Sequence, residues 1–93
     1  MAASGRALIV GAGLGGLAAA VALRRAGFEV DVYERSSAVR EVGTGLSFWS
    51  NGLRAARALG VEAQVLEKGA PIEWLENANW AGRVLQRIPL RLL

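Results

Sequence analysis

The chain of 93 residues has no cysteine and no histidine, and these two absences exclude several kinds of site. Without cysteine there is no disulfide, no thiolate nucleophile and no cysteine-ligated metal. Without histidine the chain lacks the most frequent general base and the most frequent metal ligand. None of the carboxylates stands in a pattern that predicts acid–base catalysis, so we assign no catalytic residue and no metal ligand. Redox chemistry in this chain would have to come from a bound cofactor.

Charged residues are few, and they are spread along the chain. They make up 20% of the sequence, hydrophobic residues make up 53%, and the net charge is +3. A composition this apolar is not that of a disordered chain. The basic residues run from Arg6 to Arg91 without a cluster, whereas a nucleic-acid surface needs a basic stripe. We therefore expect one small folded domain with no nucleic-acid partner.

The sequence also lacks a good membrane segment. Its longest uncharged run, residues 7–23, contains four glycines and lies at the short limit of a bilayer-spanning helix, about 17 residues. A secretory signal would need small residues where Arg24 and Arg25 stand. We therefore expect a cytoplasmic protein with no membrane partner.

The first third of the chain predicts a β-α-β arrangement. Residues 7–10 are a short apolar run typical of a buried strand, and residues 28–34 alternate between apolar and polar as a second strand. Between them, residues 14–26 predict a helix, which two arginines in its last turn and Gly27 just beyond it should end. Strand, glycine-rich turn, helix and strand in this order open a βαβ unit, whose strands are parallel.

The rest of the chain predicts two helical pieces. Ser50 or Asn51 is expected to cap a helix that ends at Gly60, and residues 61–69 form a second helical piece.

A hairpin should follow the helical pieces. Residues 71–80 and 82–90 predict two strands around a turn near Ala81 and Gly82. Pro89 should end the second strand or place it at a sheet edge.

These elements define an α/β fold class and a division of the chain into three parts. We assign residues 1–35 to a Rossmann-like βαβ unit, residues 36–69 to a loop and helices, and residues 70–93 to the hairpin. The sheet is expected to be incomplete, because only two parallel strands are supplied, whereas a full dinucleotide-binding sheet has more.

Four of the twelve glycines lie within six positions, between the first strand and the helix. Gly11, Gly13 and Gly16 fit the pattern G-x-G-x-x-G, with Gly15 beside them. The first glycine allows a tight turn, the second lets backbone N–H groups approach a pyrophosphate, and the third lets the helix pack close to the strand. The helix N-terminus directs its free N–H groups and positive dipole end at the anion. The motif therefore predicts a dinucleotide site.

Glu34 stands at the end of the second strand, eighteen residues after the last glycine of the motif. A carboxylate at this position can accept hydrogen bonds from both ribose hydroxyls of an adenosine. It would repel a 2′-phosphate, so NADP is not expected in this site.

Three blocks of the sequence resemble the opening of one known family. They are LIVGAGLGGLAAAVALRRAG, VDVYER and VGTGLSFWSNG, and a helix that ends in RALG follows them. This set is similar to the FAD-dependent aromatic-ring monooxygenases, the para-hydroxybenzoate hydroxylase-like flavoproteins, and most similar to their salicylate and urate hydroxylase branch. The chain departs from the family at Ser50, where proline is usual. The likeness covers nearly all of the chain but only the N-terminal part of the family's length.

The resemblance implies that FAD is the cofactor. In the complete enzyme NAD(P)H would be a co-substrate, and O₂ would be used to hydroxylate a small aromatic substrate. By the same resemblance, Gly11, Gly13, Gly15 and Gly16 would approach the pyrophosphate of FAD.

The resemblance also implies roles for residues after the second strand. Arg35 would lie beside the ribose-binding glutamate. Gly45, Leu46 and Ser47 match a segment that passes near the flavin end of FAD. Arg40 matches a loop in which some members place a flavin-contacting arginine, and a solvated arginine fits this position equally well.

Two other functions stay open at this point. An NAD-binding dehydrogenase-type module would continue after Glu34 with a helix and a third parallel strand. A non-catalytic remnant would keep the motif without the function. The family's later Asp-Gly and Gly-Asp motifs do not occur in these 93 residues. We therefore expect a fragment, a truncated product or one part of a split protein, inactive by itself.

Overall fold

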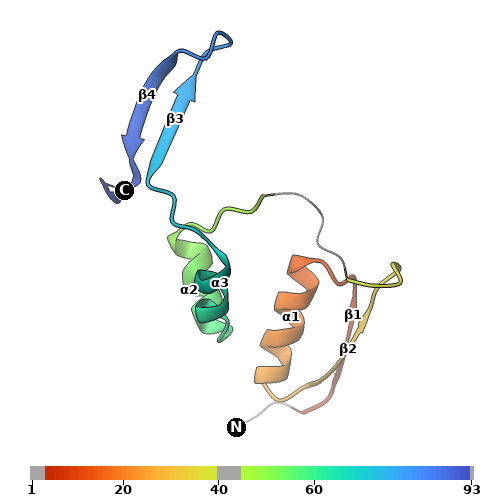
Figure 1. Cartoon of the computed structure of the whole chain (residues 1–93). Helices are drawn as coiled ribbons and strands as arrows, with labels where there is room; N and C mark the ends of the chain where they lie inside the picture. Colours follow the sequence, from red (N-terminus) through yellow and green to blue (C-terminus); the bar gives the residue numbers. More distant parts are fainter. Residues whose placement is uncertain (1–3, 40–44, 93) are drawn as a thin grey trace. The chain divides into compact units, whose positions relative to one another are not determined.

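The computed structural model describes residues 4–39 and 45–92, whose course Figure 1 shows. The chain divides into two compact units, Met1–Ala63 and Gln64–Leu93. The elements are β1 (Arg6–Val10), α1 (Leu14–Arg25), β2 (Glu29–Tyr33), α2 (Ser50–Ala58), α3 (Glu62–Lys68), β3 (Trp74–Ala78), β4 (Val84–Pro89) and the 3-10 turn η1 (Leu90–Leu92). Helices and two separate two-stranded sheets confirm the predicted α/β class and the incomplete sheet.

The first unit opens with the predicted βαβ arrangement. Strands β1 and β2 are parallel, with Arg6 opposite Glu29 and Val10 opposite Tyr33. Helix α1 connects them and contacts both strands (Figure 1). Ala7 and Ile9 alternate with more exposed neighbours along β1. This alternation is expected where one face of a sheet is covered.

Both glycines predicted to end helices in this unit do so. Gly27 and Gly60 have positive φ values of 99° and 77°. At the end of α1, the N–H of Phe28 donates to the carbonyl of Leu23, and the N–H of Gly27 donates to the carbonyl of Arg24. This pair of bonds is the Schellman motif, which satisfies carbonyls that the helix leaves free. The same pattern ends α2 at Gly60.

The predicted cap of α2 is wrong. The N-cap residue is Trp49, with extended backbone and no side-chain cap hydrogen bond, and Ser50 and Asn51 lie inside the first turn. The ring of Phe48 lies against Gly52, where an added Cβ would come within 3.2 Å of it. The N-cap thus lies one residue before the polar residues that usually take this position.

The second unit contains the hairpin of β3 and β4, whose strands pair antiparallel. The side chain of Asn79 accepts hydrogen bonds from the N–H groups of Ala81 and Arg83, both at 3.0 Å. Gly82 takes the positive φ of 81° that this turn needs. The predicted turn near Ala81 and Gly82 is thereby confirmed, and β4 ends at Pro89 as expected.

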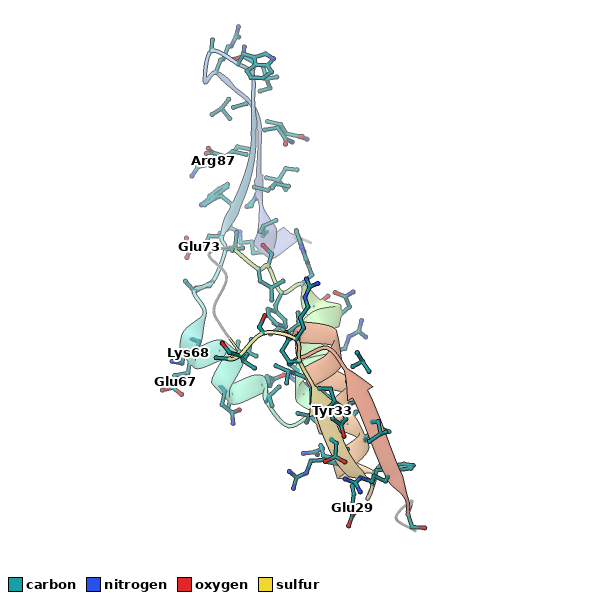
Figure 2. All side chains as sticks on the ribbon, turned by 90° about the vertical axis from the view of Figure 1, so that its right-hand side faces the viewer. Glu29, Tyr33, Glu67, Lys68, Glu73 and Arg87 are labelled. Atoms are coloured by element: carbon teal, nitrogen blue, oxygen red, sulfur yellow. The ribbon has the colours of Figure 1, made fainter. Side chains whose placement is uncertain are left out.

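Charged and aromatic side chains occupy one face of the hairpin. Arg87, labelled in Figure 2, lies over the ring of Trp74 at 3.9 Å and pairs with Glu76 at 3.0 Å. Trp80 at the turn is fully exposed.

Among the described residues, no helix has the length and apolarity that crossing a bilayer requires.

Candidate functional site

The site is built at the carboxyl ends of the two parallel strands, where β1 turns into α1. Gly11 follows β1 with a φ of +102°, a conformation that L side chains rarely adopt. Its N–H donates to the carbonyl of Tyr33 at 2.6 Å, which continues the pairing of the strands by one step. Figure 2 labels Tyr33 at this end of β2. The chain then reverses sharply into the helix, as the first glycine of the motif allows.

Gly16 lies in the first turn of α1, directly against the turn that Gly11 makes. A Cβ at Gly16 would overlap the carbonyl oxygen of Gly11 and would lie 3.5 Å from the Cγ2 of Ile9. The third glycine therefore permits the close packing of helix and strand that the motif predicts.

Gly13 and Gly15 differ from Gly11 and Gly16, because the described structure gives neither a steric reason to be glycine. An added Cβ at either position meets no atom of residues 4–39 and 45–92 within 4 Å. Gly13 is the N-cap of α1, with φ −75° and ψ −175°, which any residue can adopt. The described residues therefore leave space beside these two glycines for a group that must come close to the backbone.

The N-terminus of α1 is also electrostatically open. Its N-cap forms no side-chain hydrogen bond, its first turn has no acidic residue, and Arg24 and Arg25 stand in its last turn. Most helices place a serine, threonine or acidic residue at the N-terminus to satisfy the free N–H groups. Among the described residues no side chain takes this place at α1, so its N–H donors and positive dipole end form a candidate site for an anion.

Glu34 follows β2, and its carboxylate lies against the glycine turn. One oxygen, Oε1, accepts the N–H of Ala12 at 3.1 Å, and the other, Oε2, accepts the N–H of Ser36 at 2.8 Å. The side chain is exposed. The backbone N–H of Ser36 and then that of Ala12 lower the pKa of Glu34 below its ordinary value, because both bonds favour the charged carboxylate.

The other predicted site residues lie outside this cluster. Arg35 is exposed next to Glu34, and Gly45, Leu46 and Ser47 are exposed in the extended segment before α2. No hydrogen bond between described residues joins that segment to the glycine turn. Arg40 falls outside the described residues.

Two contributors to the site were not predicted from the sequence. Ala12 and Ser36 act through their backbone N–H groups alone. A backbone donor leaves no signal in the side-chain pattern, and only the position of Ala12 between two motif glycines could have indicated it. Among the described residues, no three acidic side chains gather closely enough to hold a metal ion.

Comparison with known proteins identifies the class of this unit. The family model of an FAD binding domain matches residues 5–91. The FAD-dependent urate hydroxylase of Mycolicibacterium vanbaalenii is 43% identical over 74 residues, which are 80% of this chain and 19% of that protein. The 6-hydroxynicotinate 3-monooxygenase of Bordetella bronchiseptica is 36% identical over 91% of this chain and 22% of its own length.

A solved structure agrees with these sequence matches. The crystal structure of Klebsiella pneumoniae HpxO, complexed with FAD and uric acid, aligns with a TM-score of 0.74 and 35% identity. The alignment covers 94% of this chain and 22% of the HpxO chain.

The chain therefore belongs to the FAD-binding domain family, among relatives that include an FAD-dependent urate hydroxylase and a 6-hydroxynicotinate 3-monooxygenase. The family expected from the sequence is confirmed, and so is FAD as its cofactor. The chain spans about a fifth of the length of the relatives that it matches.

Proposed function

We propose that this chain binds the ADP half of FAD in a flavin-dependent monooxygenase that hydroxylates a small aromatic substrate with NAD(P)H and O₂ in the cytoplasm. The observation that carries the proposal is the N-terminus of α1, where Gly13 and Gly15 meet no atom of the described residues within 4 Å and the N-cap glycine makes no side-chain hydrogen bond. The scattered basic residues give no support to a nucleic-acid partner.

The described residues fit the cofactor's polar groups. The N–H groups at the start of α1 would hold the pyrophosphate, with Gly11 and Gly16 shaping the turn that presents them. The Glu34 carboxylate would accept the ribose hydroxyls, with Arg35 beside it. Gly45, Leu46 and Ser47 would meet the flavin side, and Arg40 is proposed as a further contact there. Bound FAD would supply the redox chemistry, while this chain's residues bind and orient it.

An NAD-binding dehydrogenase module is the weaker alternative. Such a module would continue after β2 with a helix and a third parallel strand. Residues 35–39 and 45–49, the described part of that stretch, contain neither helix nor strand. The matches to FAD-dependent relatives point the same way.

Gly13→Val tests the proposed site directly. The branched side chain would fill the open space that the pyrophosphate needs, so we expect ADP and FAD to bind at least about tenfold more weakly, about 1.4 kcal/mol. Titration calorimetry and quenching of flavin fluorescence measure the two affinities.

Ala22→Val is the matched control, because it adds a branched side chain at an exposed position nearer the other end of α1. We expect this control to bind as the parent does, and circular dichroism should show the same helix content in both variants. Parent-like affinity in Gly13→Val would show that the glycine turn has only a structural role.

A further inference from the structure

Glu34 lies where a ribose would bind, and its carboxylate is also hydrogen-bonded to the glycine turn. Its Oε1 accepts the N–H of Ala12, which lies between the turn glycine Gly11 and the helix N-cap Gly13. Its Oε2 accepts the N–H of Ser36, which lies two residues after Glu34 in the chain. The carboxylate thus joins the end of β2 to the turn that follows β1.

The peptide group between Gly11 and Ala12 is held at both of its ends. The N–H of Ala12 and the carbonyl of Gly11 belong to the same planar peptide group. That carbonyl oxygen lies against Gly16, so closely that a Cβ there would overlap it. The helix therefore contacts one end of the peptide group, and Glu34 holds the other end.

A fixed peptide group matters here because the turn is rich in glycine. Glycine loses more conformational freedom on ordering than any other residue. A turn that is already ordered before the ligand arrives loses less entropy on binding, and this preorganisation raises affinity.

We propose that Glu34 is a positioning residue, whose carboxylate orders the phosphate-binding turn through the N–H of Ala12 in addition to any contact with ribose. The proposal rests on the proposed function of the turn. The two roles are compatible, since a carboxylate offers about four acceptor sites and the two N–H bonds use two of them.

A ligand without ribose hydroxyls separates the two roles. The binding of ADP and of 2′,3′-dideoxy-ADP is compared in the parent chain, Glu34→Ala and Glu34→Gln. If Glu34 acts on ribose alone, its removal leaves dideoxy-ADP binding unchanged, or strengthens it by removing a negative charge near the phosphates. If Glu34 positions the turn, Glu34→Ala weakens dideoxy-ADP binding by about 2- to 13-fold, the effect of one hydrogen bond.

Glu34→Gln provides the conservative comparison. Its amide keeps one acceptor oxygen, so it can hold one of the two N–H groups but not both. We expect the affinity of Glu34→Gln for dideoxy-ADP to lie between those of the parent and Glu34→Ala.

The ligand-free chain gives an independent measurement. In an acid titration followed by NMR of the ¹⁵N-labelled chain, the amide signals of Ala12 and Ser36 should move together, with one midpoint below the ordinary glutamate value of about 4.3. The lowered pKa of Glu34 gives this direction. The pH-dependent shifts of both amide signals should be absent in Glu34→Gln.

The outcomes distinguish the two proposals. Unchanged or stronger dideoxy-ADP binding by Glu34→Ala, with an Ala12 amide that does not titrate, would overturn the positioning role and leave the proposed function in place. Failure of the parent chain to bind ADP at all would overturn the proposed function and the positioning role with it.

Discussion

At the scale of single residues, neighbouring glycines of one motif serve different purposes. Gly11 is required by its positive φ, and Gly16 by its contact with the carbonyl of Gly11. A Cβ at Gly13 or Gly15 would contact none of the residues that the structure describes. The first pair builds the turn, whereas the second pair leaves room in front of it.

This difference predicts opposite effects of one substitution at adjacent positions. Gly15→Ala should stabilise the chain by about 0.5–1 kcal/mol, because alanine loses less backbone entropy in a helix and meets no atom here. Gly16→Ala should destabilise it by about 1–3 kcal/mol, because the new Cβ overlaps the Gly11 carbonyl. Urea denaturation followed by circular dichroism measures both, and each variant is the control for the other. Equal effects of the two substitutions would contradict the packing described for Gly16.

Part of this site could be predicted from the sequence. The glycine spacing predicts the turn, and the acidic residue after β2 is indicated by its distance from the motif. The bond from Ala12 to Glu34 could not be predicted, because it depends on where the turn places a backbone N–H. Side-chain patterns carry no information on that position.

At the scale of elements, the start of α1 and the ends of α1 and α2 agree with the sequence prediction, whereas the start of α2 does not. Gly27 and Gly60 end their helices because only glycine takes the positive φ of the Schellman motif at little cost. The predicted cap of α2 was wrong. Ser50 and Asn51 are both residues that favour an N-cap, but Trp49 takes that position. The contact of Phe48 with Gly52 is local, between residues four apart at the start of the helix, and the N-cap preferences of the polar residues do not reveal it.

The poor cap of α2 gives a prediction at this scale. Trp49 already has the extended backbone of an N-cap but no side-chain acceptor. Trp49→Asp should therefore stabilise α2 by about 1 kcal/mol relative to Trp49→Ala, a rise of about 4–8 °C in Tm for a domain of this size. Trp49→Ala is the matched control, since both variants lose the half-exposed indole and only one gains an acceptor. Equal melting temperatures of the two variants would show that Trp49 is not the N-cap.

At the scale of the whole molecule, the described chain has little buried core. Only Ala20 and Ala56 are buried among the described residues. Leu8 and Val10 on β1 are 63% and 90% exposed. Parallel sheets in folded proteins are normally covered on both faces. The chain spans about a fifth of the length of its relatives, and its described residues leave this two-stranded sheet incompletely covered.

The same incompleteness limits how the 93 residues alone can bind the cofactor. The turn and Glu34 are the proposed site for the ADP half of FAD, and for the flavin half the described residues offer only the proposed segment Gly45, Leu46 and Ser47. A hydrogen bond contributes about 0.5–1.5 kcal/mol, and 1.4 kcal/mol is a tenfold change in affinity. We therefore expect the affinity for FAD to exceed the affinity for ADP by less than about tenfold. FMN, which lacks the adenosine half, should bind far more weakly than either.

Calorimetric titration of the 93-residue chain with ADP, FAD and FMN tests this expectation, with oxidation of NADH and NADPH followed in parallel. We expect no oxidation above the rate of free FAD, because NAD(P)H passes its hydride to the flavin ring, and among the described residues only the proposed segment Gly45, Leu46 and Ser47 would contact that ring. Gly13→Val, which blocks the turn, is the control that assigns any binding to the proposed site. FAD binding a hundredfold or more above that of ADP, or oxidation of either nucleotide by the parent chain alone, would show that these residues hold the flavin as well as the ADP half.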